Sequence, residues 1–110
     1  MWTPDPAKII TAAQKAAEQR AGMLAAYKSA FDSHLDQVAQ AKQYDSRLTI
    51  VAYLSSTNPQ WAGEAETFIA WRDAALTHMF QQLAAVEAGE IAPPTIGDFI
   101  GGIPPILWPN

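Results

Sequence analysis

The chain has 110 residues, 49% of them apolar, and a formal net charge of −4. This length suits one domain with a single modest core. Residues 43–110 carry two basic and seven acidic side chains, a local charge of −5. Because contacts with phosphates or anionic membranes require clustered lysine and arginine, this composition argues against both, and we expect no nucleic-acid partner.

Cysteine is absent, which excludes disulfides and thiolate sites. The first ten residues, MWTPDPAKII, lack the basic region and apolar run of a secretory signal. No segment approaches the roughly 20 apolar residues of a membrane span. We therefore expect synthesis in the host cytoplasm without membrane insertion.

Residues 5–43 are predicted to form one long helix, or two helices that meet near Gly22. The cluster TPDP at residues 3–6 combines a capping hydroxyl with prolines that a first helical turn tolerates. Such a helix would be on the order of 55–60 Å long, about twice the diameter of a small domain. We therefore assign residues 23–43 to the core and residues 1–22 to a projecting arm.

Small and apolar side chains recur along this segment at alternating steps of three and four residues, as in a coiled-coil seam. The seam comprises Ile10, Ala13, Ala17, Arg20, Leu24, Tyr27, Phe31, His34, Val38 and Ala41. Its alanine-rich half permits close approach of a second helix, so Trp2, Ile10, Ala13 and Ala17 are candidate contacts for oligomerisation or docking. A solvated, partly frayed arm is an alternative of equal weight.

Residues 47–54, RLTIVAYL, have the β-branched and aromatic content of a strand. A strand requires a pairing partner, and no second strand-like run occurs in the sequence. We therefore predict a short helix, with Asp45 or Ser46 as its cap.

Residues 58–88 are predicted to form the long central helix. Asn58 and Pro59 are typical of a helix start, and Gly89 is typical of a helix end. One apolar stripe is formed by Trp61, Ala65, Phe68, Arg72, Ala75, Leu76, Met79, Leu83 and Val86. Ile69, Trp71 and Phe80 lie outside its centre, which predicts contacts with two elements at once.

The last part of the chain changes in composition to EIAPPTIGDFIGGIPPILWPN. Thr95 and Asp98 resemble a capping box for one short helical turn that Gly101 and Gly102 end. Residues 103–110 contain three prolines and are predicted to be extended. Their apolar residues Ile106, Leu107 and Trp108 are candidate contacts of a docking tail.

The sequence therefore predicts an all-α fold, a small helical bundle at residues 23–102 around the central helix, flanked by the arm and the tail. His34 and His78 lack a second ligand at helical spacing, so packing or surface roles are favoured and no metal site is expected. Glu64, Glu66 and Asp73 are interpreted as solvated charges, because nothing indicates a concave acid–base site. We expect no cofactor and no catalytic residues.

Arg72 lies on the apolar stripe, where an unpaired charge would be costly. We predict that it binds a carboxylate, with Asp45 as first choice, or loop carbonyls beneath a tryptophan face. Asp45 and Arg72 are thus the candidate polar residues of the core.

Four local patterns together resemble a helical domain of small bacteriophage and prophage proteins associated with tail fibres. They are HLDQVAQAKQYDS at 34–46, NPQWAGEAETFIAWRDAA at 58–75, VEAGE at 86–90 and PPT at 93–95. The resemblance covers about residues 24–110, although the tail GGIPPILWPN is more apolar than the family pattern. None of these patterns is a catalytic motif.

The resemblance implies a non-enzymatic structural or adaptor protein of a tail fibre or baseplate, located in the virion tail. Its expected partners are phage tail or fibre proteins, with a second copy of the chain as a further option. The alternative is a fibre-assembly chaperone that is not retained in the particle. A small enzyme or host-directed inhibitor is a third class, which a deep polar pocket with converging acids would favour.

Overall fold

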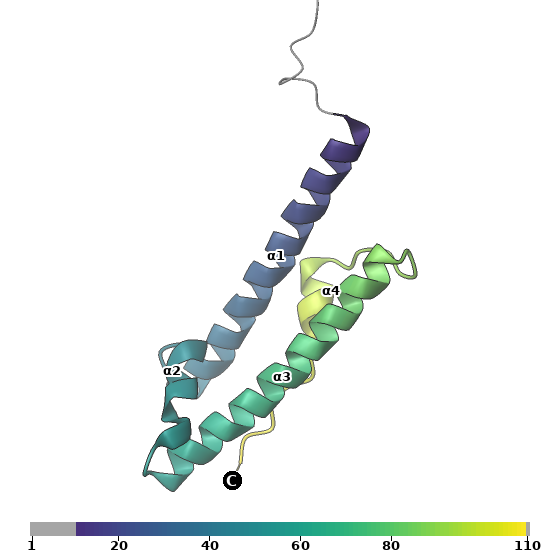
Figure 1. Ribbon diagram of the computed structural model, residues 1–110. Helices are drawn as coiled ribbons and strands as arrows, with labels where there is room; N and C mark the ends of the chain where they lie inside the picture. The colour runs from purple at the N-terminus through teal and green to yellow at the C-terminus, as the bar shows by residue number, and fades with distance from the viewer. Residues whose placement is uncertain (1–10, 110) are drawn as a thin grey trace, which may run out of the picture.

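The computed structural model describes residues 11–109, which form four α-helices and one 3₁₀ helix. These are α1 (Ala12–Ala41), α2 (Arg47–Ala52), η2 (Tyr53–Ser55), α3 (Pro59–Glu87) and α4 (Ile96–Gly101). The described residues contain no strand, which confirms the predicted all-α class. In Figure 1, α1 and α3 diverge from the end where α2 and η2 connect them, and α4 lies between them.

The first helix begins later than predicted. Thr11 is its N-cap in an extended conformation, with φ −72° and ψ 161°. Thr11 Oγ1 accepts a hydrogen bond from the Gln14 N–H, and Gln14 Oε1 accepts one from the Thr11 N–H. This capping box satisfies two free N–H groups at the helix start. A continuous helix from residue 5 is therefore wrong, and the proposed start at residues 3–6 lies outside the described residues.

The two long helices end in the same way. After α1, Gln43 has φ 73° and the Tyr44 N–H donates to the Ala39 carbonyl at 3.0 Å. After α3, Gly89 has φ 74° and the Glu90 N–H donates to the Ala85 carbonyl at 2.9 Å. Both are left-handed caps that satisfy terminal carbonyls. The predicted stop at Gly89 is confirmed.

The connection between the long helices is helical, as predicted for residues 47–54. Ser46 caps α2 by accepting hydrogen bonds from the N–H groups of Leu48 and Thr49. Asn58 caps α3 in the same manner, and proline occupies the first helical turn. These short polar side chains replace the backbone partners that a helix start lacks.

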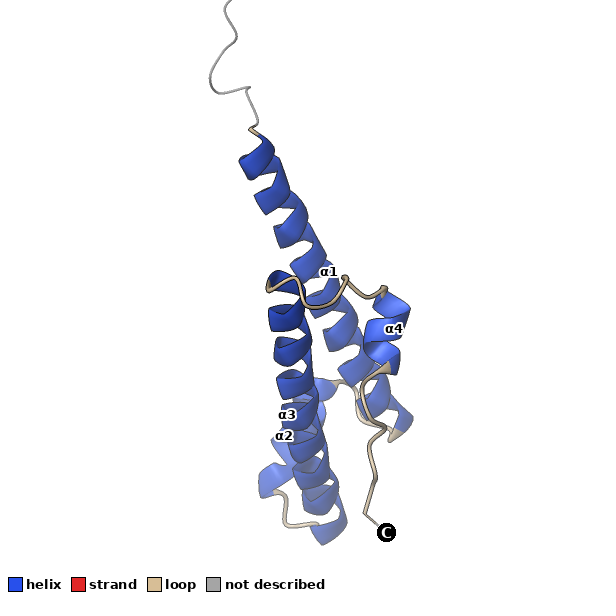
Figure 2. Ribbon diagram, turned by 90° about the vertical axis from the view of Figure 1, so that its right-hand side faces the viewer, coloured by secondary structure: helices blue, strands red, loops and turns tan. Residues whose placement is uncertain are grey.

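The core lies between the diverging helices rather than along a direct contact between them. Helix α1 buries every fourth residue, namely Tyr27, Phe31, Leu35 and Ala39. Phe99 on α4 is 1% exposed and packs against Tyr27, with ring centroids 5.0 Å apart. Figure 2 shows α4 beside α1. Helix α4 and Ile103 after it form a wedge that packs on α1 and adds Phe99 and Ile103 to the core.

Residues after α4 carry no helix and run back toward the connected end of the long helices (Figure 1). Ile103 is buried, and the Trp71 indole N–H donates to the Pro104 carbonyl at 2.7 Å. The segment is therefore fixed to α3 at its start by both apolar burial and a hydrogen bond.

The first third of α1 projects beyond the rest of the molecule (Figure 1). Every residue from 11 to 22 is exposed, and burial begins only at residues 23 and 24. This is the described part of the predicted arm. Such a helical stretch lacks the buried apolar face that stabilises most helices in proteins.

Candidate functional site

The candidate contact residues at the two ends of the chain lie in different surroundings. Ala13 and Ala17 are exposed on the projecting part of α1, whereas Trp2 and Ile10 lie outside the described residues. Leu107 is 84% exposed. Ile106 and Trp108 are half-buried and pack against the domain's own core. Only part of the apolar tail is thus available to a partner.

The predicted ion pair of Arg72 with Asp45 is wrong. Arg72 is only partly buried, and its guanidinium pairs with Asp73, the next residue, at 2.9 Å. Asp45 is exposed, and its backbone carbonyl accepts a hydrogen bond from Gln40 Nε2 at 3.1 Å. Trp71 occupies the buried position instead. One helical step rotates a side chain by about 100°, so Arg72 lies at the edge of the buried face, where its side chain is 31% exposed.

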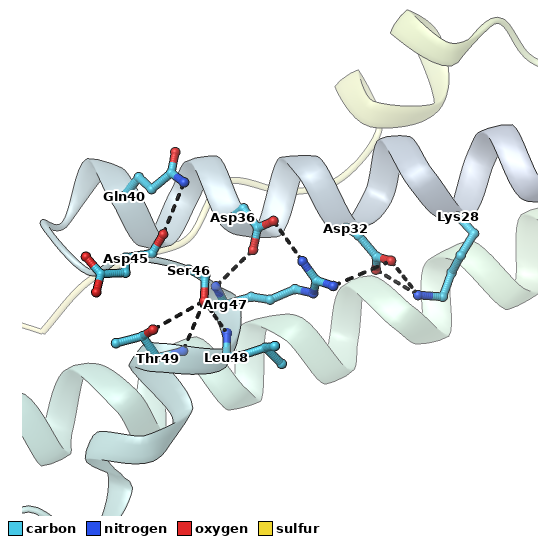
Figure 3. Close-up of polar contacts among 9 residues, drawn as sticks. All are labelled: Lys28, Asp32, Asp36, Gln40, Asp45, Ser46, Arg47, Leu48 and Thr49. Atoms are coloured by element: carbon cyan, nitrogen blue, oxygen red, sulfur yellow. Dashed lines mark hydrogen bonds and ion pairs between the residues drawn. The ribbon is translucent and has the colours of Figure 1, made fainter.

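Arg47, rather than Arg72, connects helices through charge (Figure 3). Its guanidinium lies 2.7 Å from Asp36 Oδ2 and 3.8 Å from Asp32 Oδ2, both on α1. Its backbone N–H, the first of α2, donates to Asp36 Oδ1 at 3.0 Å. Lys28 binds the other side of Asp32 at 2.7 Å. Asp36 therefore caps α2 from α1 and also holds the arginine side chain.

These contacts change the titration of Asp36. The hydrogen bond from the Arg47 N–H lowers the pKa of the carboxyl below its usual 3.8. Burial opposes this shift, and the hydrogen bond and charge of the Arg47 guanidinium lower the pKa further. A carboxyl with a lowered folded-state pKa stabilises the fold above its unfolded pKa, and this contribution is lost as the pH falls through the folded value.

We expect Arg47→Met to lower the free energy of unfolding by about 1 kcal/mol near neutral pH, because a charge-assisted hydrogen bond between partly exposed groups is lost. The deficit should shrink below pH 3.8, as Asp36 becomes protonated. Urea unfolding at neutral and acid pH measures both effects. Arg72→Met is the matched control and should change stability by less than about 0.5 kcal/mol. Equal losses in the two variants would contradict this assignment.

The second polar feature is a cleft beside Glu64, where the long helices meet. Glu64 is only 5% exposed although it carries a carboxylate. Its Oε1 accepts a hydrogen bond from the Tyr44 hydroxyl at 3.0 Å, and its Oε2 lies 3.3 Å from Lys42 Nζ. The interpretation of Glu64 as a solvated charge is therefore wrong. A buried carboxylate needs such partners to offset its lost hydration.

Aromatic side chains surround this carboxylate. Tyr44 packs against Tyr53 with ring centroids 5.3 Å apart, and Tyr53 packs against Trp61 at 5.7 Å. Burial raises the pKa of Tyr44 to about 12, with the carboxylate of Glu64 adding to the effect. Tyr44 therefore keeps its proton and acts as the donor to Glu64 throughout the physiological range.

Sequence reasoning missed the cleft because its parts come from three separate segments. Lys42 and Tyr44 follow α1, Tyr53 belongs to η2, and Trp61 and Glu64 lie on α3. One available indication was Glu64 itself, which lies four residues before Phe68 and seven before Trp71, on the same helical face. A charged residue in register with apolar ones can mark a buried polar contact.

The histidines are not brought together. His34 lies against Trp71 with ring centroids 5.8 Å apart, and burial lowers its pKa. The Nε2 atom of His78 is buried without a hydrogen-bond partner in the described part of the chain. Within residues 11–109, no group of three or more His, Asp or Glu side chains is placed to hold a metal ion.

The helices within residues 11–109 include none with the length and apolar character that a membrane span requires.

Comparison with known proteins adds no relative. No protein-family model matches the chain, and neither the curated proteins nor the solved structures give a match. The resemblance to tail-fibre-associated proteins therefore stays a prediction from the four sequence patterns.

Proposed function

We propose that this chain is a non-enzymatic structural or adaptor protein of a bacteriophage or prophage tail, acting through protein–protein contacts in a fibre or baseplate. The proposal rests on the sequence resemblance and on one structural observation, the projecting arm. Residues 12–22 form helix without burying any side chain. An isolated helix of this length is marginal in water, and packing against a partner would stabilise it.

The arm offers small side chains for close contact. Ala13 and Ala17 lie one helical turn apart, and Arg20 follows after three more residues. A second α-helix can approach such a surface closely because alanine projects only a methyl group. A partner helix, either from another tail protein or from a second copy, fits this chemistry.

Deletion of residues 1–22 tests the arm. If the arm forms a homo-oligomeric seam, the mass measured by light scattering should fall to that of a monomer, while the melting temperature of the remaining domain stays unchanged. Ala13→Lys with Ala17→Lys should act like the deletion, whereas Ala12→Lys with Ala16→Lys, on an adjacent face, should not. A monomer before and after deletion would refute a role in self-association.

A fibre-assembly chaperone is the alternative, and exposed apolar side chains favour it. Leu48 is 72% exposed and Phe80 is 61% exposed. Leu48 also lines a groove of about 300 Å³ together with Val51 and Leu76. Such surfaces suit transient contacts with apolar segments of incomplete subunits. Mass spectrometry of purified particles separates the two functions, since a structural protein is retained and a transient chaperone is not.

A further inference from the structure

The cleft beside Glu64 has a chemistry that tail association does not use. Its volume is about 510 Å³, which is large enough for a small ligand or a long side chain. It is lined by Ala41, Lys42, Gln43, Tyr44, Tyr53, Gln60, Trp61 and Glu64. Three of these side chains are aromatic and one is a buried carboxylate.

The aromatic rings meet at steep angles. The ring planes of Tyr44 and Tyr53 are inclined at 63°, and those of Tyr53 and Trp61 at 81°. Successive rings thus form a corner instead of a flat stack. Trp61 is 46% exposed, so its ring is accessible from solvent. The negative face of an aromatic ring attracts a cation, and a corner of rings can present more than one such face.

The carboxylate has unused acceptor capacity. Glu64 accepts one hydrogen bond, from Tyr44, and its ion pair with Lys42 spans 3.3 Å. Strong hydrogen bonds between an ammonium and a carboxylate are shorter, about 2.7–2.9 Å. An ionised carboxylate offers about four lone-pair positions. Glu64 can therefore accept a further N–H group.

Lys42 indicates which charge the cleft favours. Its ammonium lies beside Glu64 and 5.4 Å from the ring centroid of Trp108. This is a cation held between a carboxylate and an aromatic ring. The side chain is 34% exposed, so the flexible lysine can turn its ammonium into water and leave the carboxylate to another cation.

We propose that this cleft binds an organic cation, an alkylammonium or guanidinium group, between the carboxylate of Glu64 and the rings of Tyr44, Tyr53 and Trp61. The cation is carried either by a small molecule or by an arginine or lysine side chain of a partner. An anion is disfavoured because it would have to approach a buried carboxylate. This proposal is independent of the tail function, since it rests on the cleft alone.

Titration with tetramethylammonium, followed by the indole N–H resonance of Trp61, tests the proposal. We expect a saturable shift with tetramethylammonium and none with tert-butanol, a neutral molecule of similar shape. Equal responses to the two compounds, or no response to any cation, would overturn the proposal. Blocked arginine (N-acetyl-arginine methylamide) separates the two sources: tighter binding of arginine supports a partner side chain, and tighter binding of tetramethylammonium supports a small quaternary amine.

Substitutions of single residues then test which side chains of the cleft contribute to cation binding. Glu64→Gln should weaken binding about tenfold or more, whereas Glu66→Gln, the same change at an exposed position of α3, should leave it unchanged. Trp61→Leu should weaken binding several-fold. Because Trp61 is 46% exposed, this variant tests the site without altering a buried residue. The resonances of Tyr53 replace the indole signal as the probe of binding.

Lys42→Gln gives the most informative result. Removal of the competing internal cation should strengthen the binding of tetramethylammonium several-fold. An anionic or neutral ligand site would instead lose affinity or stay unchanged, and either result would overturn the proposal. Circular dichroism of each variant verifies that the helices are retained.

Discussion

Phe99→Ala should lower the free energy of unfolding by about 3–5 kcal/mol, which is a large part of the total stability of a small domain. Phe99 is fully enclosed between α4 and α1, and the short α4 has no other buried residue. Its truncation leaves a cavity and removes the ring that packs on Tyr27. Urea unfolding followed by circular dichroism measures the loss.

Phe80→Ala is the matched control for this variant. Phe80 is the same residue type in a helix, but it is 61% exposed, so its truncation should change stability by less than about 1 kcal/mol. Comparable losses for Phe80 and Phe99 would show that Phe99 does not anchor α4 in the core as described.

Removal of residues 103–110 should destabilise the domain by at least about 3 kcal/mol. The deletion uncovers the core beneath Ile103, which is 6% exposed. It also removes the hydrogen bond from the Trp71 indole N–H to the Pro104 carbonyl. Thermal unfolding of the shortened chain measures the effect.

Two point variants measure how much single side chains contribute to this loss of stability. Leu107→Ala should be nearly neutral because Leu107 is 84% exposed. Trp71→Phe removes the indole donor together with part of a buried ring. It should therefore cost more than the roughly 1 kcal/mol of the hydrogen bond alone. If deletion of residues 103–110 left the melting temperature unchanged, the segment would be free to dock elsewhere, as its apolar sequence alone suggested.

Sequence reasoning succeeded where structure is determined locally. The caps Ser46, Asn58 and Thr95 are set by side chains that accept hydrogen bonds from backbone N–H groups two or three residues later. The stop at Gly89 is set by the positive φ that glycine adopts without strain. The start of α1 is also determined locally, by the capping box of Thr11 and Gln14. The proline cluster at residues 3–6 nevertheless favoured an earlier start. The left-handed Gln43 had no comparable indication, since glycine usually occupies that position.

Sequence reasoning failed where the identity of the neighbouring element decides the result. Phe99 packs in the core against Tyr27 on α1, a contact that the sequence did not predict. Because α4 and the following segment take this place, the buried face of α3 is centred on Trp71 and not on Arg72. Helical periodicity alone does not distinguish two adjacent positions on a broadly apolar helix.

The cleft shows the same dependence on distant parts of the chain. Glu64 is buried because the bend after α1 brings Lys42 and Tyr44 over the first turns of α3. Nothing near Glu64 in the sequence predicts these partners, which lie about 20 residues earlier. Its register with Phe68 and Trp71 could indicate burial, but its partners follow only from the way α1, η2 and α3 converge.

The contacts of α4 also predict an order of folding. Helices α1, α2 and α3 are joined by short connections, so they can associate through contacts that close small loops. The contact of Tyr27 with Pro94 instead spans 67 residues. During synthesis, α1 and α3 are completed before α4 and Ile103 leave the ribosome. The apolar interior therefore closes last, from the carboxyl-terminal side.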